Sequence, residues 1–230
     1  MIGAIVVAAG NSRRMGGIDK LWIDLDGAPL LAHTLDAIAA TPSLGQLVLA
    51  AGPETQRRAM DHAQLPAFAR VDCWVQGGAT RQDSVHNALM ALAPCDLVLI
   101  HDGARPLVSL AVIARGIAAA RKHGAAIAAT PVTDTIKIVD DQERIHATPA
   151  RDTLRAAQTP QVFHYDLLCD AYRLVGADRA RCTDDGAVVE LAGMPVYTFL
   201  GETINIKVST PADIAIVRAL WAMRREKASR

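Results

Sequence analysis

The sequence predicts an α/β fold, a Rossmann-like three-layer αβα arrangement with a mostly parallel twisted sheet. Apolar runs of strand length alternate with stretches of helical periodicity, which is typical of βαβ units. The 230 residues are 51% hydrophobic but only 4% aromatic, so aliphatic side chains dominate, as expected for strands buried beneath helices on both faces. No repeat, low-complexity segment or interior linker divides the chain.

The strands of the first part of the chain are predicted from its apolar runs. They cover residues 2–8, 47–51, 72–75, 97–101 and 125–130. Helices fit between them at residues 29–40, 81–92 and 110–122. Strands and helices that alternate in this way give parallel strands joined by right-handed crossovers.

After residue 131 the pattern changes, and we expect a β-hairpin arm over about residues 135–155. Two β segments, 135–139 and 145–148, flank a polar turn. A two-stranded ribbon is marginally stable alone and must pack on something, such as a second subunit. Beyond the arm we expect helices at 165–175 and 184–191, strands at 196–200 and 204–208, and a closing helix that begins at Thr210-Pro211. The sequence thus predicts one domain, residues 1–230, with an arm.

Charge and composition argue against several classes of function. The 24 basic and 24 acidic residues cancel, whereas general nucleic-acid binders carry a basic excess. No apolar run reaches the roughly 18 residues of a membrane span, and the N-terminus lacks the layout of a signal peptide. The four cysteines are widely spaced, with no C-x-x-C pair, which argues against structural zinc or a disulfide framework. We therefore expect reduced thiols, a cytoplasmic location, and neither nucleic acid nor membrane as a partner.

The loop after the first strand, residues 8–20, is the first candidate site, because ligands of open α/β sheets bind beyond the carboxyl ends of the strands. Small residues let backbone N–H groups approach an anion, and Arg13, Arg14 and Lys20 supply positive charge. The loop has neither the P-loop pattern nor the dinucleotide pattern G-x-G-x-x-G. It predicts a polyphosphate cradle, with a glycine-rich surface turn as the alternative.

Later loops contain further candidates, each with a purely structural alternative. Thr80 and Asp83 either cap a helix, bind a ligand, or do both. Asp102 directly ends a strand, where it is placed to hold a divalent cation bridged by phosphate oxygens or to stabilise a turn. Thr183 precedes a helix that either Thr183 or Asp184 can cap. Lys207 in an apolar strand faces either solvent or a polyphosphate cleft. No serine nucleophile elbow, H-E-x-x-H motif or kinase signature is present, which disfavours hydrolases, zinc proteases and protein kinases.

Together these segments resemble the 2-C-methyl-D-erythritol 4-phosphate cytidylyltransferases, a family with the nucleotide-diphospho-sugar transferase fold. The matching pieces, in the family's order, are Ala8-Ala9-Gly10 with Arg13-Arg14-Met15 and Lys20, Arg81-x-Asp83-Ser84-Val85, His101-Asp102-Gly103-Ala104-Arg105-Pro106, Pro131-Val132-x-Asp134-Thr135-x-Lys137, Arg151, Thr159-Pro160-Gln161, Thr183-Asp184-Asp185 and Asn205-Ile206-Lys207-Val208. The resemblance runs from Ala8 to Asp213. One piece alone is weakly specific, but eight in order are specific.

The resemblance implies transfer of CMP from CTP to 2-C-methyl-D-erythritol 4-phosphate, with release of pyrophosphate, in non-mevalonate isoprenoid biosynthesis. It also implies Mg²⁺ or another divalent cation as cofactor, and a homodimer joined through the β arm. Each subunit would then bind CTP and a small polyol phosphate.

The resemblance also assigns roles to individual residues. The catalytic residues would be Arg14 and Lys20, which stabilise the transition state, and Arg151 and Lys207, which position the acceptor phosphate. The CTP-binding residues would be Ala8, Ala9, Gly10, Gly78, Ser84 and Asp102. The acceptor-binding residues would be Asp102, Arg105, Arg151, Thr183 and Lys207. Asp102 would also lie by the metal.

Three alternatives stay open at this point. A ribitol-5-phosphate cytidylyltransferase would use the same nucleotide half, and only Arg151, Thr183 and the arm would discriminate between the acceptors. A catalytically silent nucleotide-binding protein could keep the fold, although the cationic residues at the cradle argue against it. A nicotinamide oxidoreductase is the remotest possibility.

Overall fold

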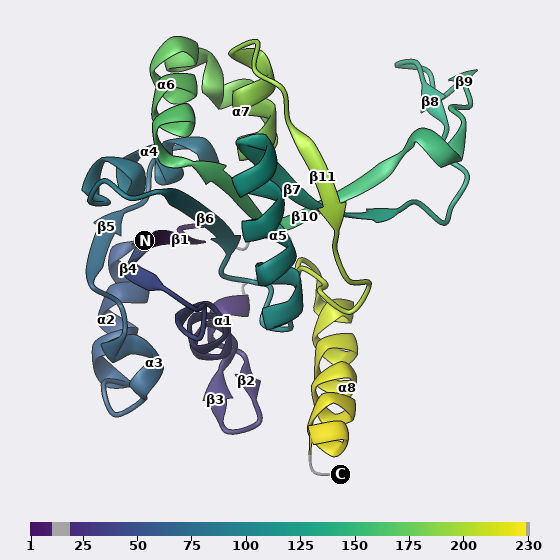
Figure 1. Ribbon diagram of the computed structural model, residues 1–230. Coiled ribbons are helices and arrows are strands. Elements are labelled where there is room, and N and C mark those ends of the chain that lie inside the picture. Colours follow the sequence, from purple (N-terminus) through teal and green to yellow (C-terminus); the bar gives the residue numbers. More distant parts are fainter. Residues whose placement is uncertain (11–18, 229–230) are drawn as a thin grey trace.

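The computed structural model describes residues 1–10 and 19–228, and this part of the chain is built around a seven-stranded twisted sheet (Figure 1). The strands are β1 (Ile2–Ala8), β4 (Leu44–Ala51), β5 (Cys73–Gln76), β6 (Leu97–Asp102), β7 (Ala125–Pro131), β10 (Arg155–His164) and β11 (Tyr197–Leu200). Their order across the sheet is β11-β7-β10-β6-β1-β4-β5. Only β10 pairs antiparallel with its neighbours in this sheet, which confirms the mostly parallel sheet predicted from the sequence.

Helices cover both faces of the sheet, as the predicted three-layer arrangement requires (Figure 1). One face packs against α1 (Leu30–Ala39), α2 (Pro53–Asp61), α3 (Pro66–Ala69) and α5 (Leu110–His123). The other packs against α4 (Arg81–Ala91), α6 (Tyr165–Val175) and α7 (Asp185–Leu191). Along β1, Ala4 and Val6 face the first set of helices and Ile5 faces the second, because successive side chains of a strand point to opposite faces. Burial on both faces explains the continuous apolar runs of the sequence.

Smaller elements extend from this body. They are η2 (Lys20–Trp22), β2 (Asp24–Leu25), β3 (Ala28–Pro29), β8 (Ile138–Val139), β9 (Ile145–Ala147), η3 (Arg151–Thr153), η4 (Gly176–Arg181) and α8 (Pro211–Ala228). The β8–β9 hairpin projects from the body as the predicted arm (Figure 1). Val217 of α8 packs with Leu25 and Val208 in a separate small core. None of the helices described combines the length and apolar character needed to cross a membrane.

One predicted strand is wrong. Residues 204–208 form no strand, although β1 and α6 have the predicted bounds. After Gly201 donates to the carbonyl of Ala129, the chain leaves the sheet edge. The backbone N–H of Val208 then donates to the carbonyl of Ala104, in the loop after β6. The apolar run of this segment is therefore explained by contact with a loop and the small core, and not by membership of the sheet.

The sequence reasoning missed β10 and the helices α2 and α3. Residues 158–161 read as a loop because they are polar and contain Pro160, which lacks an N–H for strand pairing. In the structure Thr159 and Gln161 are buried within β10, and the register with β7 shifts between Ala157 and Gln161. The polar residues of this strand therefore face an interior that can satisfy them.

The strand order determines where a ligand can bind. β1 and β6 are neighbours, and the chain leaves β1 through α1 to β4 on one side of this pair but leaves β6 through α5 to β7 on the other side. Connections that leave two neighbouring strands in opposite directions open a crevice at their carboxyl ends. Ala8 ends β1 and Asp102 ends β6, so the two residues flank this crevice.

Candidate active site

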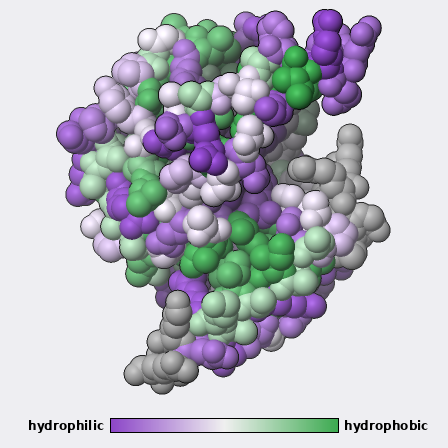
Figure 2. Space-filling view, turned by 90° about the vertical axis from the view of Figure 1, so that its right-hand side faces the viewer, coloured by the Kyte–Doolittle hydropathy of each residue, from purple (hydrophilic) through white to green (hydrophobic). Residues whose placement is uncertain are grey.

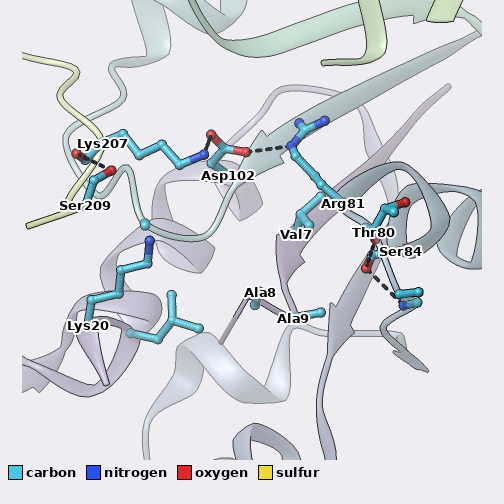
Figure 3. A pocket seen from close by; sticks show the side chains of 15 residues that line it. Val7, Ala8, Ala9, Lys20, Thr80, Arg81, Ser84, Asp102, Lys207 and Ser209 are labelled. Carbon is cyan, nitrogen blue, oxygen red and sulfur yellow. Dashed lines mark hydrogen bonds and ion pairs between the residues drawn. The ribbon is translucent and has the colours of Figure 1, made fainter. Parts of the chain in front are cut away.

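A cavity of about 570 Å³ opens at the carboxyl ends of β1 and β6 (Figure 3). This volume lies within the range of small-molecule sites. Eight residues that the sequence predicted as site residues line it, namely Ala8, Ala9, Gly10, Lys20, Gly78, Ser84, Asp102 and Lys207. The structure therefore brings together strand ends and loops that are far apart in the sequence.

The base of the cavity is formed where two loops pack with almost no side chain between them. A Cβ atom on Gly77 would lie 2.1 Å from the Cβ of Ala9. A Cβ atom on Gly78 would lie 2.3 Å from the Cβ of Asp83. Because atoms cannot approach so closely, only glycine fits at both positions, and backbone groups line this part of the cavity.

The start of α4 is held by local hydrogen bonds. Thr80 Oγ1 accepts from the N–H of Asp83 at 3.0 Å, and Asp83 Oδ2 accepts from the N–H of Thr80 at 3.2 Å, which forms a capping box. Ser84 Oγ accepts from the N–H of Gly78 and donates to the carbonyl of Thr80, both at 3.0 Å. The capping interpretation of Thr80 and Asp83 is thus confirmed, and the same contacts place the N-terminus of α4 at the cavity, where it favours an anion.

Asp102 contacts three cationic side chains, of which Arg81 and Lys207 are seen beside it in Figure 3. Its Oδ1 accepts from Arg81 Nε at 3.2 Å, and its Oδ2 contacts Lys207 Nζ at 2.9 Å and Arg105 Nε at 3.5 Å. Burial by itself raises the pKa of Asp102, but the charges of these three partners outweigh it and hold the pKa far below its usual range. The carboxylate therefore stays ionised and fixes its cations at the cavity wall.

A buried chain of hydrogen bonds positions the backbone of Asp102. Its N–H donates to Thr159 Oγ1 at 3.1 Å, and Thr159 Oγ1 lies 3.0 Å from His101 Nδ1. His101 Nε2 lies 3.1 Å from the carbonyl of Arg105, so Nε2 carries the proton and Nδ1 accepts from Thr159. Burial lowers the pKa of His101 to about 4, which keeps the imidazole neutral near pH 7.

Arg81 lines the cavity, yet the sequence reasoning gave it no role. Its Nη1 donates to Asp185 Oδ2 at 2.8 Å, in addition to its contact with Asp102. The available signal was its position, since it begins α4 directly after a glycine-containing loop. Its second carboxylate partner, however, lies more than 100 residues away in the sequence, so the sequence could not show which groups it joins.

The cavity suits a polyanion that brings its own metal ion. Its described lining contains three cationic side chains, Lys20, Arg81 and Lys207, and one carboxylate, Asp102. Among the described residues no cluster of three or more His, Cys, Asp or Glu side chains could hold a metal by itself. Mg²⁺ is commonly held by one or two carboxylates together with substrate phosphates, and Asp102 fits that pattern.

Comparisons with known proteins agree with this chemistry. The family model for 2-C-methyl-D-erythritol 4-phosphate cytidylyltransferase matches residues 2–223. The protein of that name from Dehalococcoides mccartyi is 42% identical over 219 residues, which cover 95% of both chains. The protein of the same name from Desulforamulus reducens is 41% identical over 226 residues, which cover 97% of both chains. The crystal structure of 4-diphosphocytidyl-2C-methyl-D-erythritol synthase from Anaerococcus prevotii matches with a TM-score of 0.81 at 33% identity, covering 95% of this chain and 96% of that one.

The chain belongs to the 2-C-methyl-D-erythritol 4-phosphate cytidylyltransferase family. It is therefore a nucleotidyltransferase of non-mevalonate isoprenoid biosynthesis, as the sequence resemblance implied. The fold of its structural relatives is likewise the one expected.

Three other predicted residues of this cytidylyltransferase, Arg105, Arg151 and Thr183, do not line the cavity. Arg105 is buried behind Asp102, and its Nη1 donates to the carbonyl of Asn205 at 2.7 Å. Arg151 lies in η3 at the base of the arm, exposed, and Thr183 is exposed before α7. Neither of them is part of the cavity lining. Arg14 lies outside the described residues.

The buried neutral His101 predicts a pH dependence of stability. The unfolded chain takes up a proton at this histidine near pH 6.5, whereas the folded chain takes it up only near pH 4. The folded state then binds fewer protons, so the free energy of unfolding should fall as the pH drops from about 6.5 to about 4, by about 3 kcal/mol from this group. Urea unfolding of the wild type and of His101→Gln across this pH range measures the effect, since glutamine cannot titrate. Equal slopes for both proteins would contradict it.

Proposed function

We propose that the cavity binds CTP and that this chain transfers the CMP unit to 2-C-methyl-D-erythritol 4-phosphate. The observation that carries the proposal is the group of Lys20, Arg81 and Lys207 around Asp102 at the carboxyl ends of β1 and β6. Family membership supplies the identity of the two substrates.

The chemistry requires charge neutralisation more than a reactive side chain. A phosphate oxygen of the acceptor attacks the α-phosphorus of CTP in line, the bond from that phosphorus to the bridging oxygen breaks, and pyrophosphate leaves. Two polyanions must approach each other, so cations between them lower the barrier, and positioning with electrostatic stabilisation is sufficient. No nucleophilic residue of the protein is needed for this step.

We assign the parts of the cavity accordingly. The small residues Ala8, Ala9 and Gly10, with Gly78 and Ser84, would hold the nucleotide, because they present backbone groups at close range. Lys20, together with Arg14, would stabilise the developing charge on the phosphates. Lys207 and Arg151 would position the acceptor phosphate. Thr183 would contact the acceptor as well.

Asp102 is the residue that would hold Mg²⁺ or another divalent cation. A carboxylate has about four lone-pair positions, so the three contacts with Arg81, Arg105 and Lys207 leave room for one further ligand bond. When bound, the ion would neutralise charge on the nucleotide phosphates. Arg105 would support this site from behind, through its contacts with Asp102 and with the carbonyl of Asn205.

We also propose that the arm joins two copies of this chain and brings Arg151 to the cavity of the partner. Apolar side chains of the arm are exposed, among them Ile138, Val139 and Ile145. A hydrophobic patch also lies on the side of the molecule that carries the arm, β11 and α8 (Figures 1 and 2). Exposed apolar surface of this kind favours a protein partner. The site of action would be the cytoplasm, in keeping with four free thiols.

The function is tested by measuring pyrophosphate release from CTP in the presence of Mg²⁺. The rate with 2-C-methyl-D-erythritol 4-phosphate as acceptor is compared with the rate with ribitol 5-phosphate. We expect release with the methylerythritol compound only. Release with ribitol phosphate alone would keep the chemistry and overturn the acceptor. No pyrophosphate release with either acceptor would favour a nucleotide-binding protein without catalytic activity.

Lys20→Ala and Lys207→Ala should each lower kcat by on the order of 10² to 10³, since each removes one preorganised charge at the reacting phosphates. Steady-state pyrophosphate release measures the loss. Lys122→Ala, which removes the same charge from an exposed position of α5, is the matched control and should turn over like the wild type. Near-normal turnover by either cavity variant would exclude the role of that lysine.

Ile138→Asp combined with Ile145→Asp should shift the protein from dimer to monomer, because it places charges on the two exposed strands of the arm. Light scattering after size exclusion measures the mass. Leu174→Asp, an exposed leucine on α6, is the control and should leave the mass unchanged. A wild-type protein that is monomeric at micromolar concentration, or a dimer that survives the arm variant, would refute the arm as the joint.

A further inference from the structure

One guanidinium joins two buried carboxylates that come from opposite halves of the sequence. Arg81 Nε donates to Asp102 Oδ1 at 3.2 Å, and Arg81 Nη1 donates to Asp185 Oδ2 at 2.8 Å. The side chain of Asp102 is 9% exposed at the cavity wall, whereas that of Asp185 is fully buried. Asp185 therefore holds the inner end of Arg81, and Asp102 holds the outer end.

Asp185 is itself locked in place. Tyr172 donates its hydroxyl to Asp185 Oδ1 at 2.7 Å, and burial raises the pKa of this tyrosine well above its ordinary value, so the phenol stays a donor. The backbone N–H groups of Asp185 and Gly186 both donate to Gln161 Oε1 at 3.0 Å. Contacts from α6 and β10 thus fix both the side chain and the backbone of the first turn of α7.

The anchor at Asp185 determines how Asp102 is shared among its cations. With Arg81 held at its inner end, its Nε reaches Asp102 at Oδ1. The other oxygen, Oδ2, is left to Lys207 at 2.9 Å and to Arg105 at 3.5 Å. Arginine and carboxylate groups favour a bidentate pair with two parallel hydrogen bonds. Arg81 has two carboxylate partners here, Asp102 and Asp185, so if Asp185 lost its charge, Asp102 would be the carboxylate left for Arg81. Arg81 would then turn toward both of its oxygens and compete with Lys207.

We propose that Asp185 is a positioning residue for the transfer reaction. It does not line the cavity. By restraining Arg81 it keeps this guanidinium away from Oδ2 of Asp102, the oxygen that Lys207 contacts, and so keeps the ammonium group of Lys207 at the place where the phosphates react. This inference rests on the role proposed above for Lys207.

Asp185→Asn is the direct test, because asparagine keeps the size and removes the charge. We expect kcat to fall about tenfold to hundredfold, the size of effect that a displacement of about 1 Å produces at a reacting centre. The KM for CTP should change much less, since the small-residue part of the cavity is untouched. The matched control is Asp170→Asn, the same change at an exposed carboxylate of α6 that pairs with Arg173. Its kcat should stay within about twofold of the wild type.

A double-mutant cycle with Lys207→Ala separates positioning from general damage to the fold. If Asp185 acts through Lys207, the double variant Asp185→Asn/Lys207→Ala should be no slower than Lys207→Ala alone, because the group being positioned is already missing. Losses that multiply would overturn the proposal. So would an Asp185→Asn variant with wild-type kcat.

A second variant keeps the inference testable if the first does not fold. If Asp185→Asn does not fold, as judged by circular dichroism, Arg81→Lys replaces it in the cycle, since a single ammonium group cannot bridge both carboxylates. The same non-additivity with Lys207→Ala is expected, and multiplying losses would again refute the positioning role. Failure of the proposed function itself would look different, because the wild type would release no pyrophosphate, whatever happens at Asp185.

Discussion

The ionised carboxylate of Asp102 is the feature on which the site depends. It lies at the carboxyl end of β6 with little exposure, and a charge so placed is costly unless cations compensate it. Arg81 from α4, Arg105 from the loop after β6, and Lys207 from the segment before α8 supply that compensation. Three separate segments are therefore held in one place by one negative charge. Losing that charge would leave three cations repelling one another beside the nucleotide cavity.

The strand β10 provides the buried polar groups that this arrangement needs. It runs antiparallel between β7 and β6, and two of its polar side chains, Thr159 and Gln161, are buried. Thr159 holds the backbone of Asp102, and Gln161 holds the start of α7. Buried polar groups need hydrogen-bond partners. The polar side chains of β10 find theirs in the neighbouring segments, and in return they hold those segments in place.

The two halves of the proposed reaction differ in how they are assembled. The predicted nucleotide residues that the structure describes converge within one chain, on the ends of β1 and β6 and the start of α4. Arg151, predicted for the acceptor, lies at the base of the arm, outside that cavity, where its Nη1 donates to the carbonyl of Thr133. If the nucleotide-binding part of the site lies within one chain and the acceptor-binding part is completed by the arm of a second chain, catalysis would depend on association of the two chains.

The sequence by itself determined the elements whose signal is local. The apolar run of β1, the helical periodicity of α6 and the polar turn of the arm are each encoded within a few neighbouring residues. Strand-end positions also pointed to Lys20 and Asp102 as site residues, because the ends of parallel strands meet at one edge of a sheet.

Only the tertiary structure decided the features whose partners are distant in the chain. Residues 204–208 look like a strand, yet the backbone N–H of Val208 bonds to a loop carbonyl. Residues 158–161 look like a loop, yet they lie within a buried strand. Asp185 looks like an ordinary acidic residue at a helix start, yet it is buried and accepts from Arg81. Local pattern cannot carry this information, because hydrogen-bond partners and burial depend on segments that meet only when the chain has folded.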